Sequence, residues 1–131
     1  MTQTKSGWPS VIAAITLFVE DLEAAKEFYQ QVFGLPVTFE DDDSVVFKFG
    51  ETLVNLLTAT AALELVDPAR VATPDAGSRM QLTLHVDDVD RLCEELITRG
   101  VTLLNGPMDR PWGVRTASFR DPAGHIWEVA K

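Results

Sequence analysis

Glu128 is the residue of this chain whose setting most needs a chemical explanation. It lies beside Trp127 in segment 126–129, which is otherwise apolar enough to be buried. A buried carboxylate needs a hydrogen-bond donor, a positive charge or a bound cation. A carboxylate on the solvated face of an edge strand needs none of these, and most strand carboxylates are solvated. Both interpretations stay open from this residue alone.

A turn with a defined chemistry precedes Glu128. Asp121 can accept hydrogen bonds from nearby backbone, Pro122 fixes φ at the second turn position, and Gly124 tolerates the exit conformation. The flanking segments 115–119 and 126–129 mix β-branched, aromatic and small residues. Residues 110–129 therefore predict a closing β-hairpin.

Length and charge limit the possible functions. The 131 residues predict one domain with a modest core, and 46% hydrophobic with 24% charged residues is ordinary for a globular protein. Twenty acidic residues against eleven basic ones give a net charge of −9, which repels nucleic acid and anionic membranes and attracts cations. We therefore expect neither nucleic acid nor a membrane as partner.

The N-terminal segment and the single cysteine indicate a cytoplasmic protein. Residues 1–10 form a polar tail without the pattern of a signal peptide, and no apolar run approaches membrane-spanning length. Cys93 is the only cysteine, so no internal disulfide forms. It lies on the apolar face of a predicted helix, where we expect an inert core thiol.

The first half of the chain predicts a strand, a helix and three further strands. Residues 11–19 alternate as a strand, and Asp21 can cap a helix that Gly34 ends. Strands follow at 36–40, 44–49 and 52–58. Residues 59–79 then indicate a connector broken by prolines, with 63–66 as a turn of helix or a short strand.

After the connector the pattern begins again. Residues 83–90 repeat residues 16–23 at an offset of 67 positions with four identities, which indicates an internal duplication. Asp88 can cap a second helix that ends before Gly100, and strands follow at 101–104, 114–119 and 125–130. We predict one domain, 11–131, made of module 1 (11–58), the connector (59–79) and module 2 (80–131).

The order βαβββ, present twice, predicts an α+β fold. A four-stranded sheet with one helix leaves its other face exposed, so two modules can curve their mixed sheets around a shared cavity. Alternation identifies the non-helical face: Gln81, Thr83 and His85 oppose the apolar Leu82 and Leu84. Any binding site should lie on that face.

The chain resembles the vicinal oxygen chelate superfamily, which includes glyoxalase I, extradiol dioxygenases, fosfomycin-resistance transferases and bleomycin-resistance proteins. The resemblance rests on the repeat, on the passages LFVEDLEAAKEFYQQVFG and LHVDDVDRLCEELITRG, and on the closing PWGVRTASFRDPAGHIWEVA. It covers nearly the whole domain and implies the glyoxalase/bleomycin-resistance-like fold. It does not select one activity, because this scaffold serves several chemistries.

The resemblance also implies four metal-ligand positions, which fall at Ala14, Asn55, Gln81 and Glu128. Of these only Glu128 is a strong ligand, and Ala14 offers no donor. His85 lies four residues from Gln81, roughly 13 Å along the strand, too far for both to bind one ion. We therefore expect no cofactor. If a divalent metal such as Mn, Ni, Zn or Fe binds, Gln81, Glu128 and Asn55 are its ligands.

Without a metal, the resemblance implies a pocket for a small organic molecule. The residues expected to line it are Thr16, Phe18, Asn55, Gln81, Thr83, His85, Trp112, Arg115 and Glu128. Rings, amides and hydroxyls suit an aromatic ligand, and the acidic excess favours a cationic one. This pattern is similar to bleomycin-resistance proteins, in which a homodimer sequesters its ligand.

Three alternatives stay open. The chain could instead be a metal-dependent lyase, isomerase, dioxygenase or transferase, with His85 or Glu128 as acid or base. Arg115 could simply pair with one of the many acids. Trp8 and Trp127 are expected to serve packing, whereas Trp112 follows a proline in a glycine-containing loop, where exposed rings often contact a ligand.

Overall fold

The protein divides into two compact units, each with its own sheet. The computed structural model describes residues 7–131, so most of the predicted polar tail lies outside the described residues. The first unit comprises residues up to 26 together with 35–71, and the second comprises 27–34 with 72–131. Helix α1 (Leu22–Phe33) therefore contributes its first turns to one unit and its last turns to the other.

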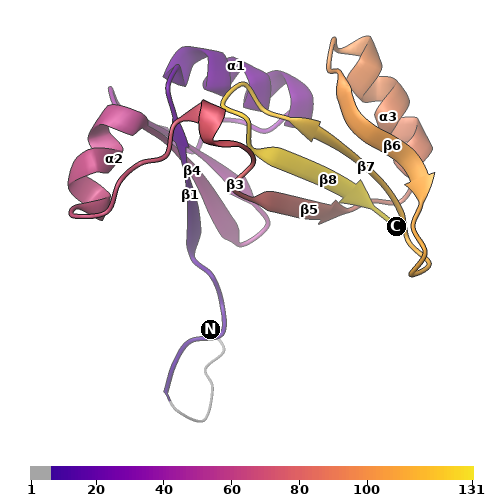
Figure 1. Cartoon of the computed structure of the whole chain (residues 1–131), viewed down its shortest axis with the longest axis horizontal. Coiled ribbons are helices and arrows are strands. Elements are labelled where there is room, and N and C mark those ends of the chain that lie inside the picture. Colours follow the sequence, from indigo (N-terminus) through magenta and orange to yellow (C-terminus); the bar gives the residue numbers. More distant parts are fainter. Residues whose placement is uncertain (1–6) are drawn as a thin grey trace. The chain divides into compact units, whose positions relative to one another are not determined.

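The first unit contains a four-stranded mixed sheet in the order β1-β4-β3-β2. Three of these strands, β1, β4 and β3, are labelled in Figure 1. Strand β1 (Ala14–Val19) pairs parallel with β4 (Thr52–Thr58), and β3 (Ser44–Phe49) pairs antiparallel with both β4 and β2 (Phe39–Glu40). Alternate side chains of β1 and β4 are buried, at Leu17 and Val19 and at Val54 and Leu56. Asp21 accepts a hydrogen bond from the Ala24 amide at 3.0 Å, which confirms its role as the cap of α1.

The connector is more regular than predicted. Helix α2 (Ala59–Val66) fills its first part, and the Thr58 hydroxyl caps this helix by accepting from the Ala61 amide at 3.2 Å. A short 3-10 helix, η1, follows at Pro74–Ala76. The run of alanine and leucine in 59–66 consists of strong helix formers, which outweighed the turn signals further along. In contrast, β1 begins at Ala14 and β2 has only two residues, so both strands are shorter than predicted.

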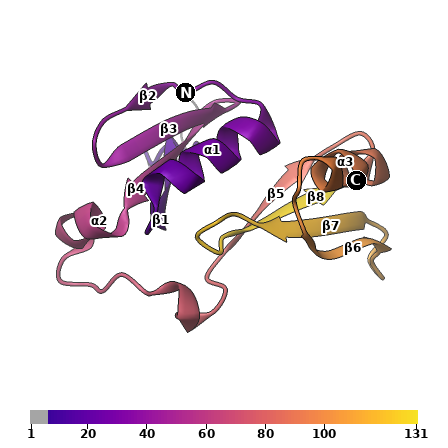
Figure 2. The ribbon, with the colours of Figure 1, turned by 90° about the horizontal axis from the view of Figure 1, so that it is seen from above.

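The second unit repeats this arrangement with the strand order β5-β8-β7-β6. Its strands are β5 (Gln81–His85), β6 (Leu103–Asp109), β7 (Arg115–Arg120) and β8 (Ile126–Ala130). Helix α3 (Val89–Thr98) lies along one face of the sheet (Figure 2), and Asp88 caps it through the Arg91 amide at 3.1 Å. The predicted α+β fold with two βαβββ modules is confirmed. The predicted module boundaries and the shared cavity stay predictions.

The helix-bearing face of the second sheet holds an apolar core. Val89 and Cys93 of α3 pack against Ala117 and Val129 of the sheet. Cys93 is buried, and burial together with the nearby Asp90 carboxylate raises the pKa of its thiol, as expected of an inert core thiol.

The last turns of α1 complete this core with aromatic rings. Phe33 and Trp127 have ring centroids 4.8 Å apart, and Tyr29 meets Trp127 edge-on at 5.9 Å. Trp127 is fully buried, so its predicted packing role is confirmed. Trp8 is 72% exposed in the single chain, and its packing role stays a prediction. Within residues 7–131, no helix has both the length and the apolar character needed to cross a membrane.

Gly106 provides a test of the packing between β6 and β7. A Cβ atom at this position would lie 2.4 Å from the Thr116 carbonyl oxygen and 2.7 Å from the Ala117 Cα, and φ is +85°. We predict that Gly106→Ala lowers the free energy of unfolding by about 3 kcal/mol or more, because backbone strain and overpacking add.

Gly113→Ala is the matched control for this substitution. Gly113 has φ +90°, but a Cβ atom added there would meet no other atom within 4 Å, so only the strain of about 1–2 kcal/mol applies. Urea unfolding of both variants measures the difference. Equal losses of stability would contradict the close approach at Gly106.

Candidate ligand-binding site

One face of the second sheet carries a row of polar side chains that crosses all four strands. The register places four residues opposite one another in sequence across the sheet: Thr83, Glu128, Ser118 and Asn105. Successive side chains of a strand point to opposite faces, and Trp127 and Val129 point to the helices. The row therefore lies on the face away from α3, called the open face below.

Glu128 has a hydroxyl as its partner. The Thr83 Oγ1 donates a hydrogen bond to Glu128 Oε1 at 2.9 Å, and Glu128 is half-buried. Strand β8 lies between β5 and β7, so the interpretation of Glu128 as a residue on an edge strand is wrong. Among residues 7–131, no Lys, Arg or His side chain lies within 4.0 Å of this carboxylate. The charge is held by a neutral donor and is available to a ligand.

Gln81 and His85 flank Thr83 on the same strand. Both are exposed, and they lie opposite Ile126 and Ala130 respectively on β8. The structure thus brings four of the predicted lining residues, Gln81, Thr83, His85 and Glu128, onto one face of one sheet. Whether these residues bind a ligand stays a prediction.

Arg115 lies on the opposite face, which corrects its predicted place. Arg115 is two residues from Ala117 on β7, so both side chains point to the helix-bearing face. Its guanidinium pairs with Asp90 of α3 at 2.9 Å and with Asp109 at 3.0 Å. The hydrogen bonds to these two carboxylates raise the pKa of Arg115. The alternative interpretation, pairing with local acids, is the one that the structure shows.

Arg110 occupies the open face instead, and the sequence pattern did not single it out. Its Nε donates to Thr116 Oγ1 at 2.8 Å, and its Nη2 donates to Asn105 Oδ1 at 3.3 Å. The guanidinium lies 5.9 Å from the ring centroid of Trp112, which is 70% exposed in the turn between β6 and β7. The exposed ring agrees with a ligand contact at Trp112, which stays a prediction.

The first unit carries the remaining candidates on its own sheet. Thr16 of β1 and Asn55 of β4 are register partners, and Phe18 lies opposite Leu57 two residues further along. Asn55 Oδ1 is buried without a hydrogen-bond partner, the one such side-chain atom among residues 7–131. A buried acceptor without a donor is costly, and a ligand or water that donates to it would remove the cost.

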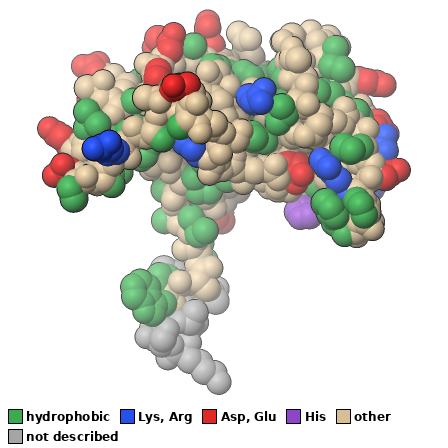
Figure 3. Space-filling model, in the orientation of Figure 1, with side chains coloured by type: hydrophobic (Ala, Val, Ile, Leu, Met, Phe, Trp, Pro, Cys, Tyr) green, Lys and Arg blue, Asp and Glu red, His purple; other side chains and the backbone are tan. Residues whose placement is uncertain are grey.

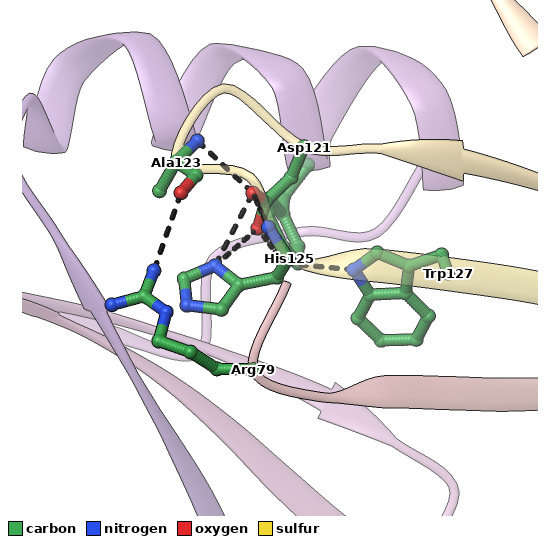
Figure 4. Close-up of polar contacts among 6 residues, drawn as sticks. Arg79, Asp121, Ala123, His125 and Trp127 are labelled. Atoms are coloured by element: carbon green, nitrogen blue, oxygen red, sulfur yellow. Dashed lines mark hydrogen bonds and ion pairs between the residues drawn. The ribbon is translucent and has the colours of Figure 1, made fainter. Parts of the chain in front are cut away.

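A buried polar cluster fixes the turn before β8 (Figure 4). Asp121 accepts hydrogen bonds from the Tyr29 hydroxyl at 2.7 Å and from the amides of Ala123 and His125 at 3.0 and 2.9 Å. The His125 ring lies 3.0 Å from the same carboxylate through Nδ1. His125 is only 4% exposed, so its ring is enclosed together with this carboxylate.

The donors available do not fit a divalent cation. The metal positions implied by the resemblance hold one carboxylate, Glu128, which already accepts from Thr83, two neutral amides and Ala14, which has no donor. A divalent site generally takes about three good protein ligands with anionic or imidazole donors among them. Within residues 7–131, no three His, Cys, Asp or Glu side chains are grouped to hold an ion.

Comparison with known proteins assigns the family. The family model of the Glyoxalase/Bleomycin resistance protein/Dioxygenase superfamily matches residues 11–129. The chain is also 34% identical over 121 residues to the uncharacterized protein YraH of Bacillus subtilis (strain 168), covering 89% of this chain and 94% of that protein. The chain belongs to the glyoxalase/bleomycin resistance/dioxygenase superfamily.

Solved structures agree with this assignment. A glyoxalase-related enzyme from Fulvimarina pelagi is 29% identical with a TM-score of 0.79, over 92% of this chain and 87% of that one. A glyoxalase/bleomycin resistance protein/dioxygenase from Nocardioides is 25% identical with a TM-score of 0.83, over 92% and 82%. A lactoylglutathione lyase from Agrobacterium tumefaciens is 27% identical with a TM-score of 0.76, over 93% of each chain.

Tyr29 provides a spectroscopic test of the cluster at Asp121. Burial, followed by the charge of Asp121, raises the pKa of Tyr29 far above its ordinary value of 10.0. Because the chain has one tyrosine, absorbance at 295 nm reports this residue alone. We predict no ionisation step near pH 10 in the folded protein and a normal step in urea.

The raised pKa also predicts a loss of stability in alkali. The unfolded chain releases the tyrosine proton near pH 10 while the folded protein retains it, so the stabilisation is complete below pH 10 and falls as the pH rises. Tyr29→Phe should lack this part of the pH dependence. A normal titration at 295 nm in the folded state would contradict the buried contact.

Asn55→Leu tests the unpartnered oxygen in the first unit. Replacing a buried acceptor that has no donor with an apolar side chain of similar shape should raise the free energy of unfolding by about 1 kcal/mol. Asn105→Leu is the matched control, because Asn105 accepts from Arg110 and should not gain. A loss of stability in Asn55→Leu as large as in the control would show that Asn55 is satisfied in solution.

Proposed function

We propose that this protein binds small organic molecules without a metal ion, on the open face of the second sheet and on the face of the first sheet that carries Thr16 and Asn55. The observation that carries this proposal is the composition of the polar row on the second sheet. One carboxylate, held by a threonine hydroxyl, is surrounded by neutral hydroxyl and amide groups. Such groups recognise an organic ligand by hydrogen bonds and do not form the anionic set that a divalent cation needs.

The first sheet supports the proposal through Asn55. Its buried Oδ1 is an acceptor that still lacks a donor, and its register partner Thr16 offers a hydroxyl on the same face. Phe18 and Leu57 supply apolar surface beside them. The pattern of apolar surface with a few polar groups is typical of sites for small organic ligands.

The charge balance favours a ligand with a cationic group. Glu128 has no basic partner among the described residues, and acidic side chains are scattered over the face of the molecule drawn in Figure 3. The net charge of −9 attracts cations over longer distances. Sequestration of an aromatic or cationic compound, as by a bleomycin-resistance protein, therefore agrees best with the site.

A second candidate is an enzyme of the same superfamily. His85 is exposed on the open face, two residues along β5 from Thr83, the register partner of Glu128, which supports His85 as an acid or base beside the carboxylate. The likeness to a lactoylglutathione lyase from Agrobacterium tumefaciens favours a lyase or isomerase within this class. Turnover that His85→Gln abolishes without changing ligand affinity would establish this candidate over sequestration.

The assembly and the cellular setting belong to the proposal as well. We expect a homodimer in the cytoplasm, with a role in resistance to a toxic compound. Sedimentation equilibrium tests the dimer, and a monomer mass that does not change with concentration would contradict it.

Titration calorimetry with metal-free bleomycin, a cationic aromatic compound, tests the proposal. We predict saturable binding, and a loss of affinity of about tenfold or more in Glu128→Gln, because a charge-assisted contact is replaced by a neutral one. Glu94→Gln is the control, since Glu94 is an exposed carboxylate on α3. It should leave the affinity unchanged.

The same instrument tests the role of metals. Titration with MnCl₂, NiCl₂ or ZnCl₂ should give no saturable heat. Tight binding of one of these ions that Glu128→Gln abolishes, together with no binding of metal-free bleomycin, would overturn the proposal in favour of a metal-dependent enzyme.

A further inference from the structure

We infer that the ligand of the open face of the second sheet carries a negative group as well as a positive one. The negative group would pair with Arg110, the positive group with Glu128, and the planar body of the ligand would span the distance between these two residues. This inference rests on the proposed function and names its ligand class, an organic zwitterion.

Arg110 is held on the open face by the geometry of the β6–β7 turn. Its amide donates to the Val114 carbonyl at 2.7 Å, which closes the turn. The preceding residue, Asp109, pairs with Arg115 on the helix-bearing face. Because neighbouring residues of a strand point to opposite faces, Arg110 points to the open face, as its bond to Thr116 Oγ1 requires.

The partners of Arg110 are all uncharged. Thr116 and Asn105 accept its two hydrogen bonds, and within residues 7–131 no carboxylate lies within 4.0 Å of its guanidinium. Arg115, five residues further along on the other face, is paired with two carboxylates. The chain has twenty acidic and eleven basic residues, yet the Arg110 guanidinium on the open face contacts only neutral groups. Its positive charge is therefore available to a ligand.

The open face therefore carries two opposite charges that do not neutralise each other. Asn105, Ser118 and Glu128 lie opposite one another on three neighbouring strands. Two strand spacings separate Asn105 from Glu128, about 10 Å between backbones. That span suits one small molecule with its charged groups at opposite ends of a ring system.

The surroundings of Arg110 suit an oxyanion attached to a planar body. A guanidinium has five N–H groups in a planar fork, and the two bonds to Thr116 and Asn105 use Nε and one hydrogen of Nη2. The remaining donors, on Nη1 and Nη2, can bind a carboxylate in the bidentate manner. The exposed ring of Trp112, whose centroid is 5.9 Å from the guanidinium, offers a stacking surface beside it.

Three related compounds test this inference by chemical-shift titration of the ¹⁵N-labelled full chain. 4-(Aminomethyl)benzoate carries both charges, 4-(aminomethyl)benzamide carries only the positive one, and 4-methylbenzoate carries only the negative one. We predict that the zwitterion binds at least tenfold more tightly than either singly charged compound, with shifts centred on β6, β7 and β8.

Substitutions assign each charge to its residue. Arg110→Gln should reduce the affinity for the zwitterion to that for the benzamide, and Arg110→Lys should restore part of the difference because it retains the charge. Glu128→Gln should reduce the affinity to that for the methylbenzoate. Arg70→Gln, an exposed arginine of the first unit, is the control and should change nothing.

The outcomes separate this inference from the proposed function. Equal binding of the zwitterion and the benzamide, both lost in Glu128→Gln, would overturn the inference and leave the proposed function standing. An unchanged preference for the zwitterion in Arg110→Gln would also overturn it. Absence of shifts on the open face with all three compounds, and with metal-free bleomycin, would overturn both.

Discussion

Parallel pairing between the first and the last strand of each unit is the constraint on which the site depends. In the first unit β1 pairs with β4, and in the second unit β5 pairs with β8. A parallel neighbour requires a long crossover, which the helix and the intervening strands supply. The pairing makes the last strand an inner strand of its sheet and sets Thr83 beside Glu128, as it sets Thr16 beside Asn55. The duplicated sequence thus produces two related polar positions, of which only the second is charged.

The helix-bearing face of the second sheet holds a buried hydrogen-bond network, and the open face carries the Glu128 carboxylate. On the helix-bearing face, Asp121 orders the turn before β8 through the Ala123 and His125 amides, and Tyr29 and Trp127 extend this network into the core. A fully satisfied buried network makes the position of the following strand rigid. Glu128 lies only seven residues after Asp121, so the network also fixes where its carboxylate emerges on the open face.

Much of this could be predicted from local signals. The bounds of β3 and β4 and the caps at Asp21 and Asp88 follow from alternation and capping chemistry, and the repeat places the second module. The prediction that Arg115 lines the ligand pocket was avoidable, because Arg115 and the apolar Ala117 are two residues apart on one strand and therefore point to the same face. Arg110 was harder to find, since register shifts in β6 between Leu103 and Met108 break the alternation that leads to it. The buried His125 contact depends on packing that no local pattern specifies.

The central claim is that the site binds its ligand without a metal ion, because it lacks an anionic donor set. The metal content of the purified protein tests this claim most directly. Inductively coupled plasma mass spectrometry of protein purified from medium supplemented with Mn, Ni, Zn and Fe measures the metal bound per chain. We predict that each metal is far below stoichiometric and that Glu128→Gln does not change this. One equivalent of a single metal per chain, lost in Glu128→Gln, would contradict metal-free binding.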